Sequence, residues 1–367
     1  MVEVAFSVSD ICTWISGRLV NGDSASGRFD SVRVCRPAAL VGSGPTDVSF
    51  FFSKVYQNEV PGARPGILIV GDEFVEALKA SGLPIWSHSA VVACARPYEA
   101  MAIVSEHFAP VLLHSVLGLT DENLEAVELD PAAVVHSSVQ IGLGSRVASG
   151  VVIEEGAVIG RRCILYPGVY LGHGVVLGDH CVLFPHVVVY EGTRIGHRVR
   201  VHANTTLGSD GFGYAPVLGS LADEKPQVLN HRKIHHFGGV RIGDDVEIGA
   251  NSCVDRGTLA DTVIDSKAKL DNQVHVGHNA YVQEGAVLCG GVALAGNARV
   301  GKFAYVGGLT GVINHVYIGD GAQVGALTLV SKDVPAGGNA VGNPQREHRE
   351  FFRVQAWLSK NALVRRK

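Results

Sequence analysis

An aliphatic side chain returns at every sixth position through more than half of the chain, and this period constrains the fold more than any other feature. The first run extends from Val135 to Leu207, and the second extends from Ile242 to Val330 with one slip of four residues after Val254. Helices repeat apolar residues about every 3.6 positions and strands about every two. A period of six fits neither, and it is typical of a parallel β-helix in which each hexad forms a short strand and a corner.

A second register accompanies the first, because a small side chain often stands four residues after the aliphatic position. Ser145, Cys163, Cys181 and Ala286 are examples. We expect the aliphatic side chains to fill the interior and the smaller ones to lie where the corner narrows. Three hexads would close one triangular coil, so residues 18 positions apart should stack at the strand spacing of about 4.8 Å. The predicted fold class is therefore mainly β.

No hexads occur in residues 1–128, which have the pattern of a small α/β domain. Helical patterns occur at residues 75–79 and 98–108, and short apolar runs typical of strands occur at residues 66–70 and 90–93. We therefore expect an N-terminal α/β domain before the coils.

The β-helix is expected to occupy residues 129–342, with an insertion at residues 209–238. The insertion begins near DGFGYAP and ends with HRKIHHFGG, and its aromatic and cationic side chains favour a functional loop over an idle one. Residues 343–367 are predicted to form a C-terminal basic helix. This helix could cover the open end of the solenoid, and its cations, which include Arg365, Arg366 and Lys367, could also meet an acidic partner.

Composition excludes several classes of protein. The 367 residues are 47% hydrophobic and 18% charged, and the net charge of −4 gives no electrostatic basis for binding nucleic acid. No segment approaches the roughly 18 apolar residues of a membrane helix, and the first residues lack the features of a signal peptide. The seven cysteines are scattered without a CxxC motif. We expect them to be reduced and the protein to be cytoplasmic.

The histidines do not have the spacing of a metal site stacked on the coils. Zinc carbonic anhydrases built from hexapeptide coils take metal ligands from histidines two coils apart, which is 36 residues. The chain has 16 histidines, and no two of them are 36 residues apart. The expectation is therefore that no metal is bound.

The segment LDNQVHVGHN places polar residues at successive corner positions around His275 and His278. One coil after His278 the sequence has Gly296, and one coil further it has Asn314, next to His315. We expect these residues to line one edge of the prism. An imidazole can accept a proton near neutral pH, and a glycine amide can stabilise an oxyanion, which together suit acyl transfer. The alternative is a hydrogen-bonded surface histidine beside a simple bend.

Four motifs occur in the order of a known family. The segments IGDDVEIGANSCVDRGTLADTVID, KLDNQVHVGHN, CGGVALAGNARVG and GGLTGVINH closely resemble the UDP-3-O-acylglucosamine N-acyltransferases of lipid A biosynthesis. The DGFGYAP loop and the helical tail fit as well, and PTDVSFFFSKVY is similar to the uridine-recognition segment of the family. The resemblance covers nearly the whole chain and implies that the β-helix is left-handed.

The resemblance implies roles for several residues. His278 would be the general base that takes a proton from the glucosamine 2-amine as the amine attacks a thioester. Gly296 would supply the oxyanion N–H, and His315 would lie in the same cleft. Asn279 is expected to take part in binding the substrate, and Asn279 and Asp271 are both candidates for orienting His278.

In the N-terminal domain, Phe50 and Tyr56 would sandwich the uracil ring. Ser53 stands where the family often has asparagine. His275 replaces a usual glutamine, and the pair His235-His236 replaces a proline-glutamine pair. These departures alter the polar groups expected around the site.

The resemblance also implies the partners. The acyl donor would be a 3-hydroxyacyl chain on the phosphopantetheine of acyl carrier protein, and no cofactor would be permanently bound. That carrier is acidic, which suits the basic tail. The enzyme would be a homotrimer with active sites at the subunit clefts, and it would make at most a peripheral contact with the inner face of the inner membrane.

Three alternatives remain open. A hexapeptide O-acyltransferase of the same pathway also uses a histidine base, but it lacks an N-terminal domain of this size. A nucleotide-sugar N-acetyltransferase would use acetyl-CoA and can carry an α/β domain before its coils. A β-solenoid scaffold without enzymatic activity has no reason to align His278, Gly296 and His315.

Overall fold

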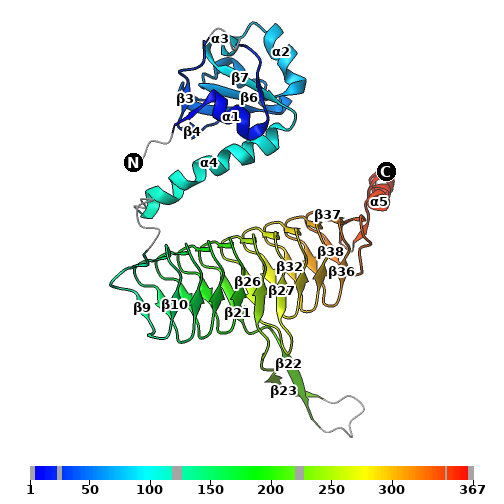
Figure 1. Ribbon diagram of the computed structural model, residues 1–367. Coiled ribbons are helices and arrows are strands. Elements are labelled where there is room, and N and C mark those ends of the chain that lie inside the picture. The colour runs from blue at the N-terminus through cyan, green and yellow to red at the C-terminus, as the bar shows by residue number, and fades with distance from the viewer. Residues whose placement is uncertain (1–4, 23–26, 118–125, 220–226, 344, 363–367) are drawn as a thin grey trace. The chain divides into compact units, whose positions relative to one another are not determined.

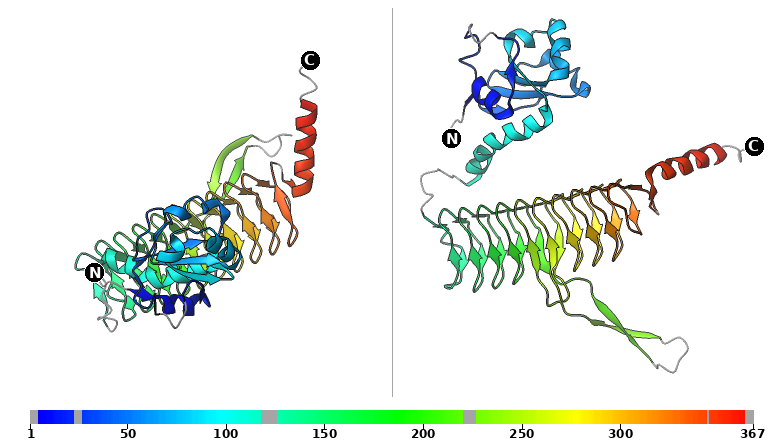
Figure 2. Two further views of the ribbon diagram at one scale, coloured as in Figure 1. Left: turned by 90° about the horizontal axis from the view of Figure 1, so that it is seen from above. Right: turned by 45° about the vertical axis from the view of Figure 1, so that its right-hand side comes forward.

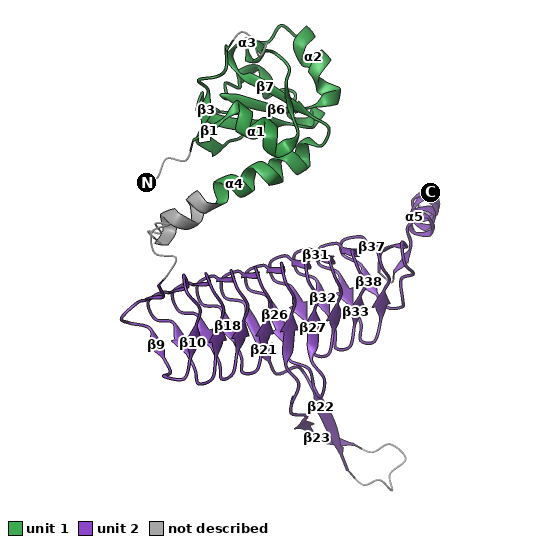
Figure 3. Ribbon diagram, viewed as in Figure 1, with its two compact units in different colours: residues 1–122 green, residues 123–367 purple. Residues whose placement is uncertain are grey.

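The computed structural model (Figure 1) describes residues 5–22, 27–117, 126–219, 227–343 and 345–362. The chain divides into two compact units, residues 1–122 and 123–367 (Figure 3). Each unit has its own hydrophobic core.

The N-terminal unit is built on a five-stranded sheet in the order β2-β7-β6-β5-β4, which is parallel except for the edge pair β2 and β7. Its strands are β1 Phe6–Ser7, β2 Arg18–Leu19, β3 Arg33–Val34, β4 Arg36–Pro37, β5 Asp47–Phe51, β6 Ile67–Gly71 and β7 Ala90–Cys94. Its helices are α1 Val8–Ile15, η1 Lys54–Tyr56, η2 Val60–Gly62, η3 Asp72–Phe74, α2 Val75–Ala80, α3 Ile85–His88 and α4 Pro97–Leu117.

Alternate residues of the central strand β6 face opposite sides of this sheet, as the period of two requires. Ile67 and Ile69 belong to a core with buried residues of α1 and α4, whereas Leu68 and Val70 belong to a core with those of α2 and α3. The predicted α/β character is therefore confirmed. Helix α4 continues to Leu117, beyond the predicted residues 98–108.

The second unit is a β-helix with three parallel sheets, as the hexads predict. The nine-stranded sheet contains β10 Gln140–Ile141, β13 Val158–Ile159, β16 Val176–Leu177, β19 Arg194–Ile195, β24 Val240–Ile242, β27 Thr262–Ile264, β30 Tyr281–Val282, β33 Arg299–Val300 and β36 Tyr317–Ile318. The ten-stranded sheet contains β9 Val134–Val135, β12 Val152–Ile153, β15 Tyr170–Leu171, β18 Val188–Val189, β21 Thr206–Ser209, β26 Cys253–Asp255, β29 His275–Val276, β32 Ala293–Leu294, β35 Gly311–Val312 and β38 Leu329–Val330.

The third sheet has twelve strands and ends in an antiparallel pair, β39 with β40. It contains β8 Glu128–Leu129, β11 Arg146–Val147, β14 Ile164–Leu165, β17 Val182–Leu183, β20 Arg200–Val201, β25 Glu247–Ile248, β28 Lys269–Leu270, β31 Val287–Leu288, β34 Tyr305–Val306, β37 Gln323–Val324, β39 Asn339–Val341 and β40 Arg346–Glu347. The helix α5 His348–Ala362 follows β40; Arg365, Arg366 and Lys367 of the expected tail lie outside the described residues.

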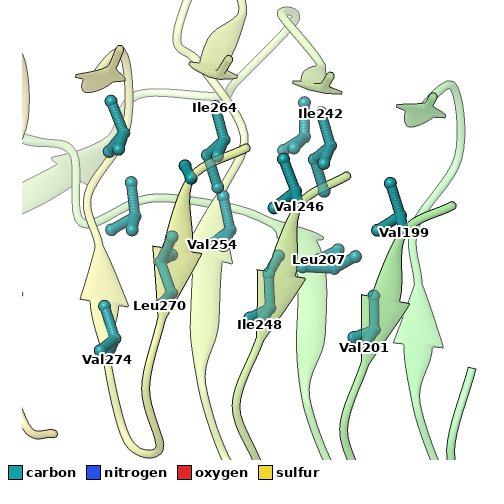
Figure 4. Packing of buried hydrophobic residues seen from close by; sticks show 14 of the residues in the cluster. Val199, Val201, Leu207, Ile242, Val246, Ile248, Val254, Ile264, Leu270 and Val274 are labelled. Carbon is teal, nitrogen blue, oxygen red and sulfur yellow. The ribbon is translucent and has the colours of Figure 1, made fainter. Parts of the chain in front are cut away.

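The hexad positions fill the interior of the coils (Figure 4). Leu171, Leu183 and Leu207 have no exposed surface, and the small Cys163 and Cys181 are equally buried at the corners. Strand pairing follows the coil repeat, since Ile164 pairs with Val182 and Leu165 with Leu183. Burial of apolar surface along this column stabilises the coils and fixes their register, because a shift by one residue would turn the aliphatic side chains outward.

Between β21 and β24 the chain leaves the coils and forms an antiparallel hairpin of β22 Tyr214–Leu218 and β23 Val228–Lys233 (Figure 2). The hairpin strands are exposed almost throughout. The base of the excursion contacts the coils, and it carries residues that matter for the site below.

None of the described helices is both long enough and apolar enough to cross a membrane.

Candidate active site

His278 lies at the corner where the chain passes from the ten-stranded to the nine-stranded sheet, between β29 and β30. Gly296 lies at the same corner one coil later, between β32 and β33. A Cβ atom placed on Gly296 would be 2.6 Å from both Cε1 and Nε2 of His278. The imidazole therefore lies directly against the backbone of Gly296, and only glycine leaves room for it there.

The other side of the His278 ring is held by hydrogen bonds. Its Nδ1 atom is 3.1 Å from Oδ1 of Asn279 and 3.3 Å from Oγ1 of Thr258. The Asn279 oxygen also accepts a bond from the Thr258 amide at 3.0 Å, and the Asn279 amide nitrogen donates to the Ala260 carbonyl at 2.9 Å. These bonds assign the oxygen of Asn279 as the acceptor, so Nδ1 of His278 carries the proton and Nε2 has the free lone pair.

Of the two expected candidates, Asn279 is the one that bonds His278, and it adopts the left-handed conformation that asparagine tolerates, with φ of 60°. Asp271, the other candidate, instead accepts a bond from the Asn272 amide through Oδ1. Thr258 was not predicted from the sequence. It lies in the four-residue slip after Val254. This break in the six-residue period was the feature of the sequence that could have indicated a role for Thr258.

A buried carboxyl group, Asp255, lies at the end of β26 in the same region. The residue is 7% exposed, and its Oδ1 accepts a bond of 3.3 Å from the Ser209 hydroxyl. Nε2 of His275 is 3.7 Å from its Oδ2. Burial raises the pKa of Asp255, and the electrostatic interaction with His275 and the hydrogen bond from Ser209 oppose this rise. His275 therefore contacts the carboxyl group rather than His278.

The insertion brings a further histidine, His236, to the site. Its ring packs edge-on against His278, with ring centroids 5.3 Å apart and an interplanar angle of 70°. His236 is 6% exposed, and burial lowers its pKa, with a further lowering from His278. The sequence marked position 236 as a departure from the family but indicated no role for it.

His315 lies one position beyond the register of His278. It shares the left-handed corner position of Asn279 and Asn297, with φ of 64°. With those residues, Gln283, Arg299 and Tyr317 it lines a polar groove of about 560 Å³, and His278 is not among the lining residues. Asn279 connects the two places, since it bonds His278 and also lines the groove.

The N-terminal unit contains an apolar groove of about 910 Å³ that includes Phe50 and Tyr56. Phe52 and Tyr98, which the sequence did not single out, also line it, and the ring of Phe52 meets those of Tyr56 and Tyr98 edge-on at 5.8 and 5.5 Å. Ser53 does not line the groove. Its Oγ accepts a bond of 3.3 Å from the Val55 amide and caps η1.

Within the described ranges, no three or more His, Cys, Asp or Glu side chains are grouped so that they could hold a metal ion. The groups that the structure brings together around this corner are the His278 imidazole, the Gly296 amide and the buried Asp255 carboxyl group.

Comparison with known proteins identifies the relatives of this chain. A family model described as bacterial transferase hexapeptide (six repeats) matches residues 156–189. The chain is 37% identical over 328 residues to the UDP-3-O-acylglucosamine N-acyltransferase of Delftia acidovorans. The aligned residues cover 89% of this chain and 83% of that protein. It is 33% identical over 347 residues to the protein of the same name from Bordetella pertussis, covering 94% and 90%.

Among solved structures, the coils resemble those of the Arabidopsis UDP-N-acetylglucosamine acyltransferase, with a TM-score of 0.52 and 25% identity over 60% of this chain and 73% of that one. This likeness supports the hexapeptide fold. The two bacterial relatives cover both units, so they are stronger evidence for the family of this chain than the Arabidopsis structure is.

Proposed function

Because the chain belongs to the UDP-3-O-acylglucosamine N-acyltransferase family, we propose that it moves a 3-hydroxyacyl chain from acyl carrier protein to the 2-amine of UDP-3-O-acylglucosamine in lipid A biosynthesis, with His278 as the general base. The observation that carries the proposal is the position of the His278 imidazole, held at Nδ1 and pressed against Gly296 at Nε2.

In this mechanism the amine nitrogen attacks the carbonyl carbon of the thioester while Nε2 of His278 accepts a proton from it. The tetrahedral intermediate then expels the phosphopantetheine thiolate, and the imidazolium returns the proton to the sulfur. The amide bond forms as the carbon–sulfur bond breaks, so no oxidant, metal or further reactant is required. The Nδ1 bond to Asn279 stabilises the imidazolium and keeps the lone pair directed at the amine.

Gly296 is the proposed oxyanion donor. Among the described residues no carbonyl accepts a hydrogen bond from its N–H, whereas the next amide, that of Asn297, donates to the His278 carbonyl at 2.9 Å. A free amide beside the base can stabilise the charge that develops on the thioester oxygen. A base of this kind contributes about 10²–10⁴-fold in rate, and one oxyanion donor contributes about 10²–10³-fold.

The apolar groove of the N-terminal unit is the proposed uridine site. Phe50 and Tyr56 offer the aromatic faces on which a uracil ring would stack. The Ser53 hydroxyl accepts the Val55 amide, which leaves its proton available for a uracil carbonyl. The polar groove that contains His315 and Arg299 is proposed to hold the diphosphate and sugar or the pantetheine arm.

A homotrimer is proposed because the outward face of the ten-stranded sheet has no Arg, Lys, Asp or Glu side chain at the first residue of any strand. Its outward residues are Val134, Val152, Tyr170, Val188, Thr206, Cys253, His275, Ala293, Gly311 and Leu329. The other two sheets carry arginines, lysines or glutamates in the same positions. A face without charged groups is suited to burial against another copy of the chain.

The proposed carrier site is α5, where Arg349, Arg353 and Lys360 provide cations and Trp357 is 63% exposed. These features suit an acidic carrier protein. The proposed place of action is the cytoplasm, which agrees with seven cysteines that form no disulfide in the structure.

The test compares His278→Ala with His173→Ala. His173 is an exposed histidine two residues after β15, the same corner position that His278 occupies after β29, but several coils away. We expect His278→Ala to keep the circular dichroism and melting temperature of the wild type and to lose about 10²–10⁴-fold in turnover. His173→Ala should be fully active. Near wild-type turnover of His278→Ala would remove His278 as the base.

A second measurement separates the proposed reaction from the alternatives. Mass spectrometry would identify the product formed from UDP-3-O-acylglucosamine when acetyl-CoA and a panel of acyl-loaded carrier proteins are offered together. The expected product carries a 3-hydroxyacyl amide. An acetamide would instead identify an acetyltransferase, and no product at all would favour a scaffold.

A further inference from the structure

His236 is the feature of the active-site corner that the proposed reaction leaves unexplained. It follows strand β23 at the base of the insertion, and it is buried to 6% exposure. Among the described residues neither ring nitrogen, Nδ1 or Nε2, has a hydrogen-bond partner. The Ile234 backbone acts on its pKa without reaching hydrogen-bond geometry.

A buried ring without hydrogen-bond partners lowers the stability of the folded protein. A buried polar atom without a partner costs about 1–3 kcal/mol, and His236 has two. An apolar side chain of similar volume would avoid this cost, so the packing of the corner does not by itself explain a histidine here.

Two glycines of the insertion leave space for the His236 ring. A Cβ atom on Gly211 would lie 2.9 Å from Nε2 of His236 and 2.7 Å from Cβ of His278, and one on Gly213 would lie 3.0 Å from Cε1 of His236. Both glycines of the DGFG sequence therefore accommodate the His236 ring and direct it to the ring of His278, whose centroid is 5.3 Å away.

Burial lowers the pKa of His236, so the ring is neutral near pH 7. A neutral imidazole has one N–H donor and one lone pair. The two ring nitrogens point in different directions, so each needs its own partner: an acceptor for the N–H and a donor for the lone pair. A hydroxyl or an amine can serve as either partner. Both substrates of the proposed reaction have such groups close to the reacting atoms, namely on the sugar ring and at the 3-position of the acyl chain.

We propose that His236 is a substrate-contacting residue, which hydrogen-bonds a hydroxyl or amine of the substrates beside His278 and so positions the reacting groups. This inference rests on the proposed acyl transfer and deepens it. It assigns a role to a residue of the insertion, whereas the coils provide His278 and Gly296.

The test uses full-length protein with His236→Leu, His236→Met and His236→Gln, and the exposed neighbour His235→Leu as the matched control. The two apolar variants should lose about 10- to 100-fold in kcat/KM, the effect of leaving a buried substrate group unpaired. Glutamine has one donor and one acceptor group on a side chain of similar length and should restore kcat/KM to within about threefold. His235→Leu should be unchanged.

The melting temperature separates this role from a structural one. The apolar variants should melt at the same temperature as the wild type or higher, because they remove two unpaired polar atoms from the interior. A large decrease in melting temperature, or failure to fold, would show that the ring is satisfied within the protein and would overturn the proposal. Wild-type kcat/KM in His236→Leu or His236→Met would also overturn it and would leave an ordered water as the partner.

Two acyl donors identify the substrate group. If the effect of His236→Leu is the same with a 3-hydroxyacyl carrier and with the carrier of the corresponding unsubstituted chain, the partner is on the amino sugar. If the effect is present only with the hydroxylated chain, the partner is the acyl hydroxyl. An inactive wild type would instead contradict the proposed function itself, so the two failures are distinguishable.

Discussion

Replacing Gly296 with alanine tests the central geometry of the site with a single methyl group. The new Cβ would lie 2.6 Å from Cε1 and Nε2 of His278 and 3.1 Å from its Cδ2. Carbon atoms in contact are usually about 3.5–4.0 Å apart, so the ring must move by about 1 Å. Gly296 does not have a positive φ angle, so alanine can adopt its backbone conformation without strain.

The displacement acts on the chemistry rather than on the fold. A movement of the ring away from the new methyl group disturbs its Nδ1 contacts with Asn279 and Thr258, which are 3.1 and 3.3 Å long. A misplacement of about 1 Å costs about 10²-fold in rate. We therefore expect Gly296→Ala to lose about 10²-fold in kcat/KM with little change in melting temperature.

The assay is the steady-state rate of amide formation, with thermal melting measured on the same samples. Gly62→Ala is the control, because a Cβ there meets no atom within 4 Å and the position has no positive φ. If Gly296→Ala keeps wild-type kcat/KM, then His278 either does not lie against this glycine or does not act from this position, and the mechanism fails. If activity and melting temperature fall together, the glycine has a structural role only.

Three further predictions concern binding, pH and assembly. Tyr56→Ala should weaken the binding of the UDP-sugar in calorimetry by about tenfold, whereas Val55→Ala, whose side chain is 81% exposed, should leave the affinity unchanged; equal affinities would contradict the uridine site. Burial raises the pKa of Asp255, so its charge destabilises the folded state as the pH rises above its unfolded value of about 3.9. Asp255→Asn should therefore melt higher than the wild type near neutral pH, with a difference that disappears toward pH ~4; a constant difference would contradict this origin. Ala293→Arg should reduce the mass in light scattering from trimer to monomer while Ala293→Ser keeps the trimer, and an unchanged mass for the arginine variant would exclude this face as the interface.

The coils were predictable from the sequence because their interior accepts one kind of side chain at one spacing. Leu165 and Leu183, which pair across adjacent coils, are both almost fully buried, and every hexad repeats this requirement. The same counting places Gly296 against His278, since no residue is inserted between them. The continuous apolar run at residues 66–70 predicted the central strand β6 of the N-terminal unit, because both faces of this strand are covered.

The positions of the other residues at the site could not be derived from the six-residue period. Thr258 lies on the four-residue slip, so its distance from His278 does not follow from the coil repeat. His236 lies on the insertion, where no repeat operates, and its contact with His278 depends on how the hairpin base folds back. His315 is one residue further than two coils from His278, so it takes the register of Asn279 and lines the polar groove with it.

Both irregularities of the repeat lie at the same corner as the imidazole. The insertion joins β21 to β24 and the slip joins β26 to β27, and His278 lies between β29 and β30; each of these links passes from the ten-stranded to the nine-stranded sheet. Because adjacent coils are only about 4.8 Å apart, irregularities stacked at one corner bring their side chains together, whereas the same changes spread over three corners would not. The regular coils thus hold the His278 imidazole and the glycine amide in place, and the departures from regularity supply Thr258 and His236 around them.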